Sequence, residues 1–154
     1  MSSGAEERDP EHIHRLLADV SSTVEFVEGR LLRLVREAAR GTVPLQDLTA
    51  ELCFLSKDLR NCYRQLAGAA DRRDLSFRTM TALEHVDRHC LWLYRKIYLE
   101  RAFYTKLDLE AKLRSSISAE GYAIYQEILC EEDGERELLA QSDAEVRNAL
   151  LGAS

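Results

Sequence analysis

Helix-breaking residues are scarce in this chain, whose 154 residues include only two prolines and seven glycines. Residues that favour strands are also few, because valine, isoleucine and threonine together occur 18 times, against 24 leucines. Leucine favours helices, whereas β-branched residues favour strands. The composition therefore favours helix over sheet and predicts an all-α protein. A chain of this length fits a single domain with one hydrophobic core.

Long uncharged apolar segments are missing as well. Arg95, Lys96, Glu100 and Arg101 interrupt the best candidate, so no apolar run reaches the roughly 18 residues that a membrane-spanning helix needs. The opening residues, MSSGAEERDP, are polar and acidic, and lack the features of secretory and mitochondrial targeting segments. We therefore expect a cytoplasmic protein with no membrane partner.

The cysteines form no CxxC or other paired motif, and each lies alone in an apolar helical pattern. They are Cys53, Cys62, Cys90 and Cys130. Disulfide frameworks and metal centres depend on cysteines at short, regular spacings. We interpret these residues as free thiols in the core.

The chain also lacks the basic excess that nucleic-acid binding requires. Its net charge is −6, and residues 1–109 are balanced, with 17 basic and 17 acidic side chains. Residues 110–154 carry 4 basic and 10 acidic side chains, which accounts for the whole excess. Binding to a phosphate backbone depends on basic groups that release counterions. We therefore expect no nucleic-acid partner.

What the chain does have is apolar residues repeated at helical spacing, mostly in steps of three and four, over three long stretches. They are Ile13, Leu17, Val20, Val24, Val27, Leu31, Leu34 and Ala38 in the first; Leu45, Leu48, Leu52, Leu55, Leu59, Cys62 and Leu66 in the second; and Leu83, Val86, Cys90, Leu93, Ile97, Tyr104 and Leu107 in the third. This spacing gives each helix one apolar seam and is typical of coiled-coil-like packing. Only Gly41-Thr42-Val43-Pro44 separates the first two stretches, so we expect their helices to lie antiparallel.

Capping residues predict where the long helices begin. Asp9 and Pro10 predict the start of the first helix, after a disordered leader over residues 1–8. The third pattern runs without glycine or proline from Ser76 to Arg114 and predicts one unbroken helix.

Two shorter helices are expected after these. One begins after the serine-rich break at residues 115–118, ends near Glu131 and folds back on the third helix. The other follows a capping box at residues 142–145. The sequence thus predicts an antiparallel bundle over residues 9–130, with three long helices, and an acidic hinge with a short C-terminal helix over residues 131–154.

The third stretch carries a second apolar stripe, formed by Trp92, Leu99 and Phe103, about 120° around the helix from its seam. One neighbouring helix cannot cover both the seam and this second stripe. Exposed aromatic residues at helical spacing anchor contacts between proteins, so this stripe is a candidate partner-binding surface. The alternative is burial under the chain's own fourth helix.

A basic strip near the end of the first helix, off its seam, is a second candidate for partner binding. It consists of Arg30, Arg33, Arg36 and Arg40. Such a strip suits an acidic surface on a filament or another subunit. The alternative is a solvated face whose last arginines also interact favourably with the helix dipole.

The sequence shows no catalytic or cofactor-binding motif, so we expect a protein that is not an enzyme and holds no cofactor. The alternative is a metal-binding bundle or enzyme that uses Glu84, His85 and His89, because the two histidines are four residues apart and can face the same way. The metalloprotease motif, however, requires a glutamate directly after the first histidine, where this chain has Val86.

The apolar seams and stripes exceed what a small monomer must bury, and leftover apolar patches tend to mark partner surfaces. We therefore predict a non-enzymatic protein–protein interaction module, a small helical subunit or adaptor of a larger intracellular assembly. A cytoskeletal or ciliary setting would suit its shape. The strict heptads leave a further alternative, a self-associating coiled-coil homodimer with no other partner.

Overall fold

The computed structural model describes residues 3–70, 75–115, 119–128 and 141–152. Three long helices form the body of the fold, namely α1 (Ser3–Arg40), α2 (Leu45–Ala70) and α3 (Phe77–Arg114). A short helix, α5 (Asp143–Leu150), and a helical segment over residues 119–128 accompany them, and no strand occurs in the described ranges. The predicted all-α bundle of three long helices with short C-terminal helices is confirmed.

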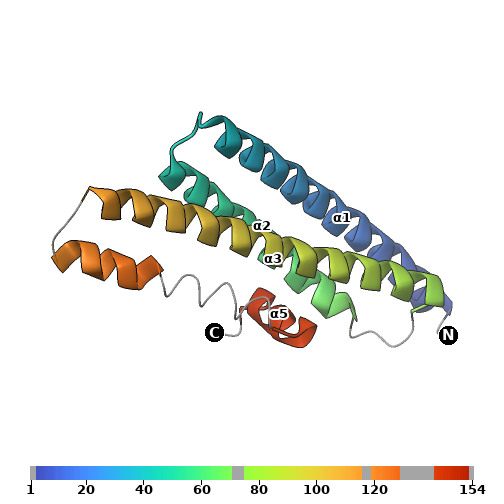
Figure 1. The fold of residues 1–154 in the computed structure, drawn as a ribbon. Coiled ribbons are helices and arrows are strands. Elements are labelled where there is room, and N and C mark those ends of the chain that lie inside the picture. The colour runs from blue at the N-terminus through green and yellow to red at the C-terminus, as the bar shows by residue number, and fades with distance from the viewer. Residues whose placement is uncertain (1–2, 71–74, 116–118, 129–140, 153–154) are drawn as a thin grey trace.

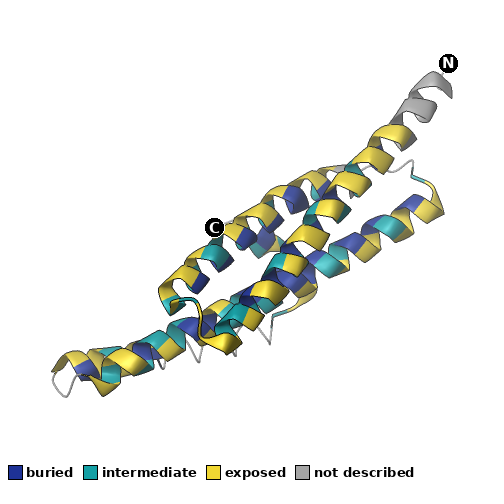
Figure 2. Cartoon of the chain, turned by 90° about the horizontal axis from the view of Figure 1, so that it is seen from above, coloured by how far each residue is buried: buried dark blue, intermediate teal, exposed yellow. Residues whose placement is uncertain are grey.

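The three long helices lie side by side, with α2 antiparallel to both α1 and α3 (Figure 1). α2 contacts both of the other long helices, and α1 also contacts α3. α5 packs against α2 and α3, while the segment 119–128 turns back along the C-terminal part of α3 (Figure 1). α3 extends past the ends of α1 and α2, as both overall views show (Figures 1 and 2).

The heptad seams form the core, and Figure 2 shows buried residues along the inner faces of the helices. The seam residues with no more than 2% of their surface exposed are Ile13, Val20, Val24, Val27, Leu31, Leu34, Leu48, Leu52, Leu59, Leu66, Cys90, Leu93 and Ile97. α5 adds Val146 and Leu150, both fully buried. Because the seams are continuous, each long helix is held along most of its length.

The turn between α1 and α2 forms where the sequence predicts. Gly41 has a φ of +67°, which glycine adopts without strain. The N–H groups of Gly41 and Thr42 donate to the carbonyls of Ala38 (3.1 Å) and Glu37 (3.4 Å), as in a Schellman motif. Pro44 then leads directly into α2, so α1 and α2 form the expected antiparallel hairpin.

Serine caps begin α3 and α5, also as predicted. Ser76 Oγ accepts a hydrogen bond from the N–H of Thr79, and Ser142 Oγ accepts one from the N–H of Glu145, both at 3.3 Å. Each bond satisfies a backbone donor that has no partner within the helix. α3 then runs unbroken for 38 residues, about 57 Å at 1.5 Å per residue, so the single helix expected up to Arg114 is confirmed.

Two details differ from the prediction. α1 begins at Ser3 rather than at Asp9, so residues 3–8 of the expected leader belong to the helix and Pro10 lies inside it. A proline near a helix start removes one backbone hydrogen bond, and the residues before it include good helix formers. Leu107, predicted for the α3 seam, is 36% exposed because α3 extends beyond its neighbours.

The predicted hinge at residues 131–137 lies outside the described residues.

Gly29 offers a test of the continuity of α1, because it is exposed in mid-helix. A side chain added at this position would have no neighbouring atom within 4 Å of its Cβ. Gly29→Ala should raise the free energy of unfolding by about 0.5 to 1 kcal/mol, since alanine loses less backbone freedom in a helix. Gly41→Ala is the matched control and should lower it by roughly 1 kcal/mol, because its φ is +67°. Urea denaturation measures both, and a less stable Gly29→Ala variant would contradict an unbroken α1.

Tyr104, in the α3 seam, gives stability a dependence on alkaline pH. Burial, followed by the nearby Glu100 carboxylate, raises the pKa of Tyr104 to about 12. An unfolded chain releases this proton near pH 10, so the stabilisation is complete below pH 10 and is lost as pH rises through 12. Denaturation between pH 9 and pH 12 should show a smaller loss of stability in Tyr104→Phe than in the wild type. Equal losses would mean that the phenol is not buried.

Candidate protein-binding surface

One polar pair marks the line of contact between α1 and α3. His89 Nε2 lies 2.8 Å from Glu28 Oε2, and because a carboxylate only accepts, the histidine donates. Trp92 follows on α3, with its ring centroid 6.2 Å from that of His89. Leu32 lies one turn after Glu28 on α1. Residues three or four apart share a helix face, so Leu32 and Trp92 emerge on the same side of the helix pair.

An exposed apolar area extends from this pair along α3. Trp92 and Phe103 each keep 50% of their surface exposed, and Leu32 keeps 46%. Leu99, between the two aromatic residues, is half-buried and packs on the core, while Leu107 continues the exposed stripe. We call these five residues the α1–α3 surface. Leu32 was not among the predicted site residues, although a leucine off the heptad seam was a visible signal for it.

The chain's own helices leave the two aromatic residues of the predicted stripe half-exposed. Leu91 and Ala102 are buried, and each is one residue, or 100° of helical rotation, before an exposed aromatic residue. α3 therefore packs on one flank and presents Trp92 and Phe103 to solvent on the next. The structure thus leaves both aromatic residues accessible, and their role in binding a partner stays a prediction.

The predicted basic strip is divided by ion pairs. Arg30 bonds to Glu51 of α2 at 3.1 Å, and Arg33 bonds to Glu37 at 3.2 Å. The strip's other members, Arg36 and Arg40, are exposed and have no acidic partner among the residues that the structure describes. Only the second half of the strip is therefore available to an acidic ligand.

The residues of the alternative metal site do not come together. His89 is bonded to Glu28, while Glu84 and His85 are exposed. Within the described ranges, no three histidine, cysteine, aspartate or glutamate side chains are placed to hold a metal ion. The geometry therefore gives the metal-binding alternative no support.

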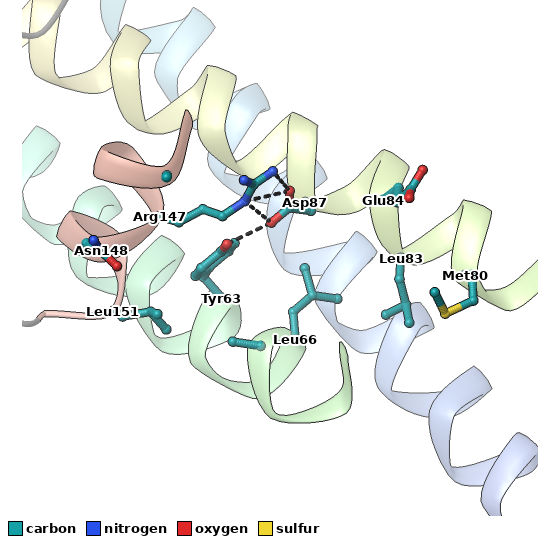
Figure 3. A pocket seen from close by; sticks show the side chains of 11 residues that line it. Tyr63, Leu66, Met80, Leu83, Glu84, Asp87, Arg147, Asn148 and Leu151 are labelled. Carbon is teal, nitrogen blue, oxygen red and sulfur yellow. Dashed lines mark hydrogen bonds and ion pairs between the residues drawn. The ribbon is translucent and has the colours of Figure 1, made fainter. Parts of the chain in front are cut away.

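A second feature, which the sequence did not indicate, is a cavity of about 440 Å³ between α2, α3 and α5. Figure 3 shows Arg147 reaching from α5 to Asp87 on α3. Arg147 donates from Nε and Nη2 to Asp87 Oδ2, at 3.1 and 2.7 Å, and the hydroxyl of Tyr63 on α2 donates to Oδ1 at 2.7 Å. Leu66 and Leu83 contribute to its apolar wall.

The polar groups of this cavity already satisfy one another. Burial, and then the hydrogen bond to Asp87, raises the pKa of Tyr63, and the same carboxylate raises the pKa of Arg147. Each group is thereby held in its ordinary charge state, with Tyr63 neutral and Arg147 protonated. Because a catalytic acid or base must release its proton near neutral pH, we interpret this network as the attachment of α5.

The two buried thiols interact with one another, and the hydrogen bond with Cys90 lowers the pKa of Cys62. Cys62 on α2 and Cys90 on α3 are free and buried, and Cys53 is free and half-buried, as predicted. A hydrogen bond to Cys62, and then burial, raises the pKa of Cys90, so it stays a thiol. Cys130 lies outside the described residues.

No protein-family model matches this sequence, and neither a curated protein nor a solved structure is significantly similar to it. None of the helices that the structure describes is both long and apolar enough to cross a bilayer.

Proposed function

We propose that this protein is a non-enzymatic interaction module that binds another protein through the α1–α3 surface, as a subunit or adaptor of a larger assembly. The observation that carries the proposal is the exposure of Trp92 and Phe103, each 50% accessible on a continuous 38-residue helix. Tryptophan is among the side chains that dominate the binding energy of protein interfaces. The cytoplasmic location and the cytoskeletal or ciliary setting stay predictions from the sequence.

A helix of the partner protein suits the geometry. Trp92, Leu99 and Phe103 follow one another at steps of seven and four residues, so they form a ridge about 16 Å long. Leu32, on the neighbouring helix, widens the apolar area. A partner helix lying along this ridge would contact it over about three turns, the usual pattern of helix recognition.

Capture of partners from cells that express the protein tests the proposal. The double variant Trp92→Ala/Phe103→Ala should lose specific partners that the wild type retains. The control is Phe26→Ala/Phe54→Ala, since these side chains are 62% and 63% exposed but lie beside Arg30 and Glu51 on the α1–α2 side. Partners retained equally by both double variants would contradict the proposal.

Self-association is the alternative, and light scattering decides it. A monomer of 17.6 kDa leaves the α1–α3 surface free for a different protein. A stable dimer that Trp92→Ala dissociates would show instead that a second copy occupies the surface, and would overturn the proposed adaptor role.

A further inference from the structure

The acidic side chains on the two helices beside the α1–α3 surface are already paired. They are Glu28, Glu37, Glu100 and Asp108, and each lies within 3.2 Å of a histidine, arginine or lysine nitrogen. The arginine and lysine partners offset the charges of Glu37, Glu100 and Asp108, whereas Glu28 accepts a hydrogen bond from His89.

The basic side chains on the helix faces of Leu32 and Trp92 are different, because three of these arginines have no acidic partner among the described residues. Arg36 lies one turn beyond Leu32 on α1, and Arg40 lies one turn further. Arg88 lies one turn before Trp92 on α3. All three are exposed, so they border the apolar area from both helices.

The nearest unpaired acidic residues on these helices lie beyond the ends of the surface. Glu25 precedes Leu32 by about two turns, Glu84 precedes Trp92 by about two turns, and Glu110 follows Leu107, the last residue of the surface, by about one turn. The part of the α1–α3 surface between Trp92 and Phe103 is therefore bordered by three unpaired arginines, in a chain whose net charge is −6.

We infer that the partner segment is an acidic amphipathic helix, a conclusion that rests on the proposed function. Its apolar residues contact Trp92 and Phe103, and its aspartates and glutamates pair with Arg36, Arg40 and Arg88. Such pairs form charge-assisted hydrogen bonds and accelerate association. A second copy of this chain is a poor occupant, because a two-fold interface would bring the same arginines together.

Trp92 reports on this surface directly, because it is the only tryptophan in the chain. The probes are two stapled helical peptides of about 18 residues with the same leucines on one face, and either glutamates or lysines elsewhere. The glutamate peptide should shift Trp92 emission to shorter wavelength and bind at least about tenfold more tightly than the lysine peptide. Raising the salt concentration should reduce the difference, since exposed charges are screened.

Charge removal identifies the arginines involved. The triple variant Arg36→Gln/Arg40→Gln/Arg88→Gln should bind the glutamate peptide at least about tenfold more weakly and no longer prefer it to the lysine peptide. Arg33→Gln is the matched control, because that guanidinium is already bonded to Glu37, and it should change affinity less than about twofold.

Three outcomes would overturn the inference: equal or tighter binding of the lysine peptide, an unchanged preference in the triple variant, or a single-stranded oligonucleotide that shifts Trp92 emission as strongly as the glutamate peptide. If any one of these occurs while Trp92→Ala/Phe103→Ala still loses partners from cells, the proposed interaction module is retained. Only the inferred acidic character of the partner is then wrong. If that double variant retains all partners, the proposed function itself fails.

Discussion

Leu59→Ala should lower the free energy of unfolding by about 3 to 4 kcal/mol. Leu59 is fully buried on the α2 seam, in the middle of the three-helix core. The substitution removes apolar contacts and leaves a cavity that the surrounding helices can close only in part. Urea denaturation measures the change from the shift in midpoint, provided that the slope is unchanged.

The same chemical change at Leu32 provides the control. Leu32 is 46% exposed on the α1–α3 surface, so Leu32→Ala should change stability by less than about 0.5 kcal/mol. Losses of equal size at the two positions would contradict the burial pattern on which both the fold and the surface depend. A near-neutral Leu32→Ala variant is also suitable for binding measurements.

Asp87→Ala should lower the free energy of unfolding by about 2 kcal/mol and loosen α5. The substitution removes the acceptor that serves Tyr63 and Arg147 together, leaving a buried hydroxyl without its partner. The ion pair itself contributes modestly, because the Arg147 side chain is 40% exposed. Hydrogen exchange should show faster exchange of the backbone amides of residues 146–150, while those of α1 change little.

A double-mutant cycle separates the pair from the rest of the network. Arg147→Ala in the Asp87→Ala background should cost less than in the wild type, with a coupling energy of about 1 kcal/mol. Tyr63→Phe, which keeps the ring and removes only the hydroxyl, should cost about 1 to 2 kcal/mol. Additive effects of Asp87→Ala and Arg147→Ala would show that this ion pair does not hold α5, which would leave its apolar contacts and the Arg95–Asp143 pair to do so.

The features that the sequence predicted are those encoded by neighbouring residues. Steps of three and four place apolar side chains along one helix face whatever the tertiary structure, so the seams were readable. The turn at Gly41 and the caps at Ser76 and Ser142 depend on bonds within a few residues. The start of α1 was predicted wrongly from Pro10, because a proline can lie at the first position of a helix or further inside it.

The attachment of α5 was not predictable from local pattern. Asp87 and Arg147 are 60 residues apart, and nothing periodic links them. The site was predicted only in part, because the stripe of Trp92 and Phe103 was visible as a pattern, whereas its exposure depended on which flank of α3 the later helices would cover. The division of the basic strip depended likewise on Glu51, which belongs to the next helix.

The tight turn at Gly41 also bears on how the molecule assembles. Because it joins two complementary seams directly, α1 and α2 can pair with little loss of chain entropy, whereas α3 must close a longer connection. We expect the α1–α2 hairpin to form early and α5 to dock last, since its acceptor on Asp87 is in place only once α3 has joined. During synthesis, the emerging chain would thus bury the facing seams of α1 and α2 before the aromatic ridge leaves the ribosome.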